Sequence, residues 1–239
     1  MILILGDLHI GLETDTGKIH RLKRIFEHFS NVEMLILLGD IFDFYFECPQ
    51  KAMEKYGEVI DIIADVASKK PVFYIQGNHD FFPLRLLQER GVKTVSKEIS
   101  LFWNGKSIYF THGDLLTTPG VITRAFLTIK LWQFLMKLLP CNLIYSTAQK
   151  ISKWSRKRSS QKEIKKAVQK EIEKLLLKHD IVITAHLHRP IVQKYDSGKI
   201  YINPGDWLYY YTFVTLENNC IILWELKEGQ IIEKEVIML

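Results

Sequence analysis

Polar side chains that can bind metal ions follow five short apolar runs of this sequence, each time directly after the run ends. The apolar runs are 2–5, 34–38, 72–75, 108–110 and 181–184. The polar residues that follow them are Asp7, His9, Asp40, Asp43, Asn78, His79, Asp80, His112, Asp114, His186 and His188. A buried charge or imidazole without a partner is costly, so this repeated pattern predicts a bound cation rather than a set of core residues.

The number and type of donors favour two cations rather than one. Seven nitrogen and oxygen donors exceed a single tetrahedral or octahedral site. They come from Asp7, His9, Asp40, Asn78, His112, His186 and His188. Mixed imidazole, carboxylate and amide donors without cysteine suit Mn²⁺, Fe²⁺ or Zn²⁺ better than Ca²⁺ or Mg²⁺. A pair of such cations, bridged by one Asp, can clamp a phosphoryl oxygen and lower the pKa of a bound water.

The elements that must position these residues alternate between strand and helix. The five apolar runs are short and mostly β-branched or aromatic, which indicates buried strands. Between them, 18–29 and 51–68 show the three- and four-residue spacing of amphipathic helices. This alternation predicts an α/β domain with a largely parallel sheet, whose carboxyl edge gathers the polar residues.

The second half of the chain follows a different pattern. Residues 121–177 read as helix only, with breaks near Pro140 and near Ser159-Ser160. After the run at 181–184, strand-like segments separated by turn residues predict an antiparallel meander. These segments are 191–195, 199–202, 211–216, 221–226 and 231–237.

The composition of the 239 residues is that of a globular protein. Apolar residues make up 47% and charged residues 25%, which excludes a disordered or low-complexity chain. The three cysteines are far apart, so we expect neither a disulfide framework nor a cysteine zinc site, and the usage fits a reducing compartment. The first residues lack the features of a signal peptide, and no run of 18 uncharged apolar residues is present.

The five blocks resemble the calcineurin-like metallophosphoesterases. They read Asp-x-His, Gly-Asp-x-x-Asp, Gly-Asn-His-Asp, Thr-His-Gly-Asp and His-x-His, in this order, between residues 6 and 188. The resemblance implies an α/β fold of two stacked mixed β-sheets flanked by helices, as a single domain over 1–239. It implies an enzyme that hydrolyses phosphoester bonds with two divalent metal ions. We expect Mn²⁺, with Fe²⁺ or Zn²⁺ as alternatives.

The same resemblance implies a role for each residue of the blocks. One metal ion would be held by Asp7, His9, Asp40 and His188. The other would be held by Asp40, Asn78, His112 and His186, so that Asp40 bridges the two. His79 would be catalytic by contacting the phosphate, and Asp80 would orient its imidazole by accepting an N–H. Ala185 stands where the family usually has glycine, and we expect only a small backbone adjustment there.

Residues 115–179 are expected to form a helical lid inserted in the domain. Apolar residues cover most of the circumference of a helix over 119–139. Such a helix either packs under neighbouring helices or faces acyl chains or a bilayer surface. Residues 150–174 hold ten Lys or Arg and three Glu, so this segment carries +7 while the whole chain carries +5. That charge suits an anionic partner, with a solvated helical face as the simpler alternative.

A second resemblance, to the UDP-2,3-diacylglucosamine hydrolases of lipid A biosynthesis, spans nearly the whole chain. It rests on Phe126, Trp132, Leu138-Leu139-Pro140, Ala148, Ser152, Ser155-Arg156, the Asp-Leu-Leu-Thr-Thr after His112-Gly113, Asn203-Pro204-Gly205-Asp206-Trp207 and Thr212. It implies cleavage of a lipid-linked nucleotide into UMP and 2,3-diacylglucosamine 1-phosphate, with two acyl chains lodged in the lid. It also implies a cytoplasmic location, peripheral on the cytoplasmic face of the inner membrane.

Substrate-binding residues are expected in the lid and near the metal edge. They are Arg156, Arg158, Lys162, Lys165, Trp132 and Trp207. One departure is that some of these hydrolases carry Arg where this chain has His79. A soluble phosphodiesterase or phosphatase, a nuclease that uses the basic segment, and a non-catalytic interaction module are the alternatives. The apolar helix argues against a soluble nucleotide as the substrate. The confinement of basic charge to one segment argues against a nuclease. The complete set of metal ligands argues against a non-catalytic module.

Overall fold

The structure is a computed structural model that describes residues 1–11, 16–80, 82–95, 97–156 and 166–239. Its strands are β1 (Ile2–Leu5), β2 (Met34–Leu37), β3 (Val72–Ile75), β4 (Lys93–Val95), β5 (Glu98–Trp103), β6 (Lys106–Thr111), β7 (Ile181–Thr184), β8 (Pro190–Lys194), β9 (Ile200–Pro204), β10 (Thr212–Glu217), β11 (Cys220–Lys227) and β12 (Gln230–Met238). Its helices are α1 (Thr16–His28), α2 (Pro49–Lys69), α3 (Arg85–Gln88), the 3₁₀ turn η1 (Asp114–Leu116), α4 (Thr118–Leu127), α5 (Lys130–Lys137), α6 (Cys141–Arg156) and α7 (Lys166–Lys178).

The strands form two mixed sheets, so the predicted two-sheet α/β fold is confirmed. The first sheet has the order β12-β11-β10-β1-β2-β3-β4, and the second has the order β5-β6-β7-β9-β8. Strands β1 to β4 run parallel, as do β6, β7 and β9. Because β1, β2 and β3 run parallel to one another, as do β6 and β7, their carboxyl ends gather at one edge of each sheet.

Alternation along the strands separates the core into layers. On β1, Ile2 and Ile4 face the second sheet, where they meet Ile108 and Ile183. Leu3 and Leu5 of the same strand belong to the cluster that lies between the first sheet and α1 and α2. Since both faces of β1 are covered, its sequence is apolar at every position.

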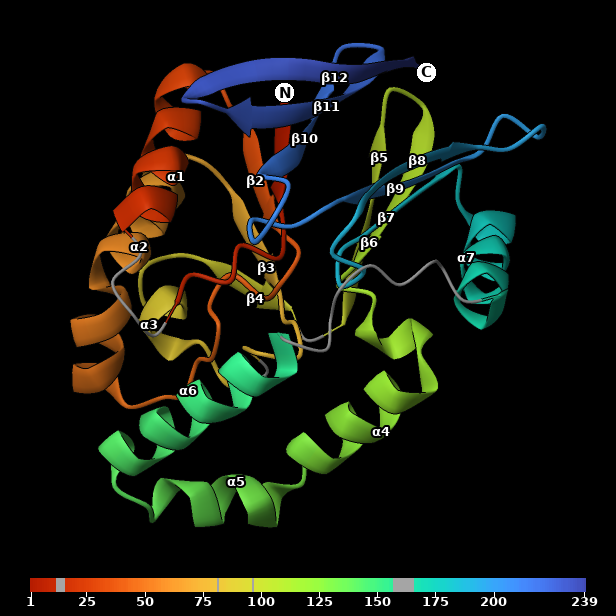
Figure 1. The fold of residues 1–239 in the computed structure, drawn as a ribbon. Coiled ribbons are helices and arrows are strands. Elements are labelled where there is room, and N and C mark those ends of the chain that lie inside the picture. The colour runs from red at the N-terminus through yellow and green to blue at the C-terminus, as the bar shows by residue number, and fades with distance from the viewer. Residues whose placement is uncertain (12–15, 81, 96, 157–165) are drawn as a thin grey trace.

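Helices cover the outer faces of the two sheets, which gives four layers (Figure 1). Helix α7 places Val168, Ile172 and Leu176 against Tyr109 and Tyr201 of the second sheet. Helices α4, α5 and α6 leave this layered body at the carboxyl edge of the sheets and return to it, as Figure 1 shows at the bottom of the view. In the part of the chain that the structure describes, no helix is long and apolar enough to span a bilayer.

The helical excursion packs into the core through α6 and also carries exposed apolar side chains. Ile144, Tyr145 and Ala148 of α6 are buried in the core cluster. Large apolar side chains of the excursion are between 44% and 66% exposed. They are Val121, Ile122, Phe126, Ile129, Phe134, Leu135, Leu138, Leu139 and Leu143. Neighbouring helices therefore leave much of this apolar surface uncovered.

Several elements differ from the sequence prediction. Strands β4 and β5 and helix α3 were not expected, and their alternating or partly exposed residues give a weak apolar signal. The predicted C-terminal meander divides, because β8 and β9 join the second sheet while β10 to β12 join the first. The predicted helix over 119–139 breaks at Thr128 and Ile129. The segment 115–179 also divides, because α7 packs on the second sheet rather than with α4 to α6.

One disulfide corrects the expectation drawn from cysteine spacing. Cys48 and Cys141 are bonded across a sequence separation of 93 residues, with their Cα atoms 6.2 Å apart. Cys48 precedes α2 and Cys141 begins α6, so only the return of the helical excursion to the body brings the pair together. Cys220 is a free thiol.

Candidate metal centre

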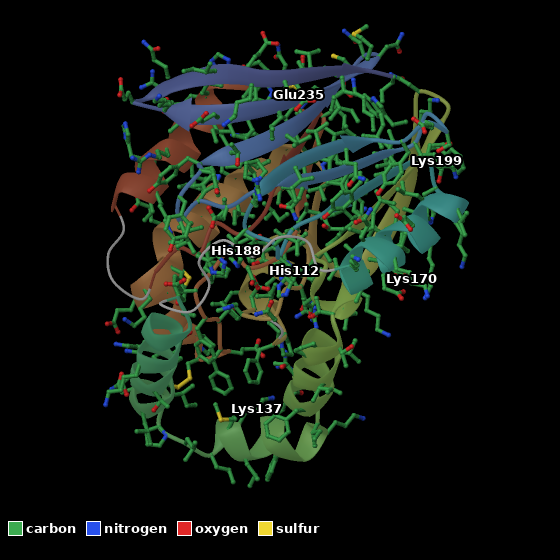
Figure 2. All side chains as sticks on the ribbon, turned by 45° about the vertical axis from the view of Figure 1, so that its right-hand side comes forward. His112, Lys137, Lys170, His188, Lys199 and Glu235 are labelled. Carbon is green, nitrogen blue, oxygen red and sulfur yellow. A yellow bond between two sulfur atoms is a disulfide. The ribbon has the colours of Figure 1, made fainter. Side chains whose placement is uncertain are left out.

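The strand ends of both sheets converge on one cluster of acidic and imidazole side chains. Three groups have potential ligand atoms within 4.8 Å of one another: Asp7, His9 and His188; His9, Asp40 and His79; and Asp40, His112 and His186. Figure 2 shows His112 and His188 at this edge, above the helical excursion. The structure thus brings together all the His and Asp residues that the sequence singled out as metal ligands, and Asn78 joins them through His112.

Asp40 lies at the centre of the cluster. Its Oδ1 accepts a hydrogen bond of 2.8 Å from the backbone N–H of His79. Its Oδ2 lies 3.4 Å from Nε2 of His112, 3.9 Å from Nε2 of His79 and 4.0 Å from Nε2 of His9. One carboxylate oxygen therefore faces three imidazole nitrogens, which is the position that a bridging ligand needs.

Backbone carbonyls fix two of the imidazole rings. Nδ1 of His112 lies 2.7 Å from the carbonyl oxygen of Leu38, and Nδ1 of His79 lies 2.6 Å from that of Asp43. Because a carbonyl oxygen only accepts, each Nδ1 carries the hydrogen and each Nε2 is turned toward Asp40. Nε2 of His112 also lies 3.1 Å from Oδ1 of Asn78.

Carboxylates support two further rings. Nδ1 of His9 lies 3.5 Å from Oδ1 of Asp43, and Nδ1 of His188 lies 3.3 Å from Oδ2 of Asp206. Asp206 is fully buried, and its Oδ1 accepts backbone N–H groups of residues 208 to 210. A carboxylate behind an imidazole fixes the ring and raises its basicity toward a metal ion.

The backbone at these positions is held in an uncommon conformation. Asp7, His9, Asp40, His186 and His188 all have φ between 45° and 68°, in the left-handed region that non-glycine residues rarely adopt. Such strain clusters at functional sites, where the surrounding structure enforces it.

Glycine allows the closest approach in this cluster. A Cβ on Gly77 would lie 2.0 Å from Oδ1 of Asp40. No other residue fits at position 77 while Asp40 accepts the backbone N–H of His79.

The shifted pKa values of three residues show that the buried carboxylates of the cluster favour positive charge nearby. Burial lowers the pKa of His112, but Asp40 and Asp7 outweigh it and raise the value to about 10. Burial alone would raise the pKa of Asp40, yet His112 and His79 hold it well below its ordinary value. For His188, Asp7 and Asp206 similarly overcome burial and raise the pKa to about 9. The buried carboxylates therefore attract protons to the neighbouring rings unless another cation is present.

Two other imidazoles are poised as neutral ligands. Burial lowers the pKa of His9 to about 4 and that of His186 to about 3. A neutral imidazole nitrogen is the form that binds a metal ion.

Buried atoms without hydrogen-bond partners fit divalent cations at this site. Oδ1 of Asp7, Nε2 of His9, Oδ2 of Asp40 and Nδ1 of His186 are buried and have no hydrogen-bond partner among the residues that the structure describes. Orphaned polar atoms are rare in folded proteins and call for an explanation. Here they point into one cluster of nitrogen and oxygen donors that suits Mn²⁺, Fe²⁺ or Zn²⁺.

The contacts of Asp80 differ from those predicted. Its carboxylate is buried and accepts hydrogen bonds from the backbone N–H of Gly77 at 2.6 Å, from that of Ile41 at 3.0 Å and from the hydroxyl of Tyr74. The imidazole of His79 is instead held by the carbonyl of Asp43. Asp80 therefore fixes the loops after β2 and β3, and the expected bond to His79 is wrong.

Trp207 also differs from its predicted role. The residue is fully buried in the core cluster, and its Nε1 donates to the carbonyl oxygen of Thr212 at 3.1 Å. A ring without exposed surface cannot stack on a substrate, so this expectation is wrong.

The side chains of the other five predicted substrate-binding residues are not among those that the structure describes. Trp132 lies within α5 and Arg156 ends α6, with backbone positions but no described side chains. Arg158, Lys162 and Lys165 lie outside the described residues.

Sequence reasoning missed Asp206 as a supporting residue. The residue follows Gly205 at the end of β9, so it repeats the pattern of an acidic side chain after a buried strand. That pattern could have found it, although β9 was expected to belong to a separate meander.

Comparisons with known proteins agree with this site. The family model described as calcineurin-like phosphoesterase matches residues 1–195. This range contains every Asp, Asn and His of the candidate metal centre except the supporting Asp206.

Three curated relatives carry the same name. UDP-2,3-diacylglucosamine hydrolase of Shewanella halifaxensis is 28% identical over 95% of this chain and 99% of its own length. The protein of that name from Escherichia coli is 27% identical over 80% of this chain and 83% of its own, and that from Coxiella burnetii is 26% identical over 80% and 81%.

Solved structures share the fold at low identity. The phosphoesterase YfcE of E. coli has a TM-score of 0.54 at 17% identity and covers 99% of this chain and 98% of its own. Vacuolar protein sorting 29 of Cryptosporidium parvum has a TM-score of 0.52 at 16% identity and covers 100% and 97%. With the family model over most of the sequence and the cluster of metal-binding side chains at its carboxyl edge, this chain belongs to the calcineurin-like phosphoesterases and is a metal-dependent phosphoesterase.

Proposed function

We propose that this enzyme hydrolyses the pyrophosphate bond of UDP-2,3-diacylglucosamine, releasing UMP and 2,3-diacylglucosamine 1-phosphate for lipid A biosynthesis. The observation that carries the proposal is the exposed apolar surface of the excursion α4 to α6, which begins at Thr118, six residues after His112. A soluble nucleotide offers no apolar group for such a surface, whereas two acyl chains do. The name shared by the curated relatives supports the same substrate.

In this proposal two divalent metal ions, Mn²⁺ in the first instance, are held at the strand ends. One set of ligands is Asp7, His9, Asp40 and His188, and the other is Asp40, Asn78, His112 and His186. When bound, such ions polarise phosphoryl oxygens and lower the pKa of a bound water.

His79 is the proposed catalytic side chain. The side chain of His79 is 26% exposed, whereas those of His9, Asp40 and His112 are at most 4% exposed, so His79 is more open to a substrate phosphate than these ligands. Because Nδ1 donates to the carbonyl of Asp43, Nε2 is the nitrogen that faces the substrate, and the protonated ring would give its Nε2 proton to the leaving oxygen or neutralise the charge there.

The excursion α4 to α6 is proposed to act as a lid that binds the acyl chains. We further propose that its apolar side chains meet the bilayer surface from which the substrate comes, on the cytoplasmic face of the inner membrane. Trp132, Arg156, Arg158, Lys162 and Lys165 remain proposed contacts to the sugar, its phosphates or lipid headgroups.

The test compares two substrates with the same enzyme. UMP release from UDP-2,3-diacylglucosamine and hydrolysis of a soluble aryl phosphodiester are both measured with Mn²⁺ and detergent. Phe134→Asp should lower turnover of the lipid substrate at least about tenfold, since it places a charge on surface meant for acyl chains, and leave the aryl substrate unchanged. Phe102→Asp, on the far more exposed Phe102 of β5, is the matched control and should affect neither.

The outcomes separate the reaction from the substrate. Release of UMP that EDTA abolishes would support the proposal. Hydrolysis of the aryl diester without release of UMP would leave the metal-dependent chemistry in place and point to a soluble phosphoester as the substrate. Equal damage to both substrates by Phe134→Asp would reject the lid as an acyl-chain site.

A further inference from the structure

The guanidinium of Arg124 links two loops that each carry a ligand of the same proposed metal ion. Its Nε donates to Oδ2 of Asp114 at 2.9 Å, and one terminal nitrogen donates to Oδ1 of Asp114 at 3.1 Å. The same terminal nitrogen donates to the carbonyl oxygen of Gln76 at 2.7 Å. The guanidinium therefore makes three hydrogen bonds to two separate segments.

The two segments come from different sheets. Asp114 stands two residues after His112, at the end of β6 in the second sheet. Gln76 stands two residues before Asn78, at the end of β3 in the first sheet. Nε2 of His112 lies 3.1 Å from Oδ1 of Asn78. The hydrogen bonds of Arg124 therefore join the same two loops that these two ligands join.

Burial makes this bridge a strong one. The side chain of Asp114 is 1% exposed and that of Arg124 is 11% exposed. Two hydrogen bonds between a guanidinium and one carboxylate fix both position and angle, and they gain strength away from water. A buried Arg–Asp pair also costs desolvation, so its presence here indicates a role in specifying geometry.

Helix α4 is attached to the same point at its beginning. The hydroxyl of Thr117 donates to the carbonyl oxygen of Asp114 at 2.9 Å and accepts the backbone N–H of Gly120 at 3.0 Å. Asp114 is therefore held through its carbonyl at the start of α4 and through its carboxylate by Arg124 near the end. The first helix of the excursion is thus attached at two points to Asp114, just after the end of β6.

We propose that Arg124 is a positioning residue that holds the half of the site formed by Asn78 and His112, with Asp114 as its partner. The inference rests on the proposed pair of metal ions and not on the lipid substrate. It predicts that loss of Arg124 weakens the binding of one metal ion selectively, since the hydrogen bonds of Arg124 go to the segments that carry His112 and Asn78. Removal of a residue that supports a ligand typically costs 10–100-fold in metal affinity.

The test measures Mn²⁺ binding to the full chain by equilibrium dialysis and electron paramagnetic resonance. Wild type should bind two Mn²⁺ as an interacting pair. Arg124→Gln should keep one Mn²⁺ at wild-type affinity, lose affinity for the other by about 10–100-fold and give the signal of an isolated ion. Arg124→Lys should be intermediate, because an ammonium keeps the charge but lacks the planar fork that pairs with both carboxylate oxygens while reaching the Gln76 carbonyl. Arg85→Gln, which removes an exposed Arg paired with Glu47, is the matched control and should bind as wild type.

Three results would overturn the proposal. The first is that Arg124→Gln binds two Mn²⁺ with wild-type affinity. The second is that folded Arg124→Gln loses affinity for both ions equally. The third is that a folded Asp114→Asn/Arg124→Gln double variant binds Mn²⁺ as wild type does. The double variant removes both charges, so it remains informative if Arg124→Gln unfolds around an unpaired Asp114. Activity on the aryl phosphodiester should recover in Arg124→Gln at high Mn²⁺. If wild type binds two Mn²⁺ but does not hydrolyse the lipid substrate, only the proposed function is contradicted, and the role of Arg124 is not.

Discussion

The carboxylate of Asp7 accepts a hydrogen bond of 2.7 Å from the backbone N–H of His186, which lies 179 residues further along the chain. This bond joins the carboxyl end of β1 in the first sheet to that of β7 in the second. Because Oδ2 of Asp7 is used in this way, Oδ1 is left without a hydrogen bond inside the cluster. One side chain therefore both aligns the two sheets and presents a ligand atom.

Replacement of Asp40 by Asn tests the central carboxylate. The amide oxygen can still accept the backbone N–H of His79, but the charge that faces His9 and His112 is lost. We expect turnover to fall by more than about 100-fold, beyond the usual effect of losing a supporting residue. Bound metal, measured by elemental analysis, should fall with it. Asp65→Asn, at an exposed residue paired with Lys69, should change neither quantity.

Replacement of Asp206 by Asn tests a residue that the sequence analysis did not assign to the site. The Asn oxygen can keep the bonds to the backbone of residues 208 to 210, while the charge behind His188 disappears. Metal affinity should fall by about 10–100-fold, with little change in the metal-free unfolding temperature. A titration that finds wild-type affinity in this variant would show that His188 needs no carboxylate partner.

Replacement of His79 by Ala separates catalysis from metal binding. We expect turnover to fall by about 10²–10⁴-fold while the metal content stays at the wild-type level. The loss should be largest for substrates with a poor leaving group and small for an aryl leaving group, since a good leaving group needs no proton. His28→Ala, at an exposed histidine of α1, serves as the control. An equal loss for both kinds of leaving group would argue against proton donation.

Replacement of Trp207 by Ala tests its place in the core. Truncation of a fully buried Trp typically lowers the free energy of unfolding by about 3–5 kcal/mol, which denaturant titration measures directly. The milder Trp207→Phe variant should bind substrate with an unchanged KM, because the ring has no exposed surface. A raised KM in a stable Trp207→Phe protein would indicate that Trp207 contacts the substrate after all.

The sequence by itself determined the chemistry and the elements that carry it. Continuous apolar runs such as 2–5 and 181–184 identify strands buried on both faces, because such strands cannot alternate polar and apolar residues. The types of residue after each run, above all Asp40 and His112, identify a cation site, because local chemistry fixes which groups can bind a metal ion.

Only the tertiary structure decided how distant parts of the chain meet. The division of β8 to β12 between two sheets, the disulfide of Cys48 with Cys141 and the Arg124 bridge from Asp114 to Gln76 all depend on contacts far apart in sequence. The support of His79 by the Asp43 carbonyl rather than by Asp80 has the same origin. Hydrophobic periodicity reports which face of an element is buried, but it does not report which partner covers that face.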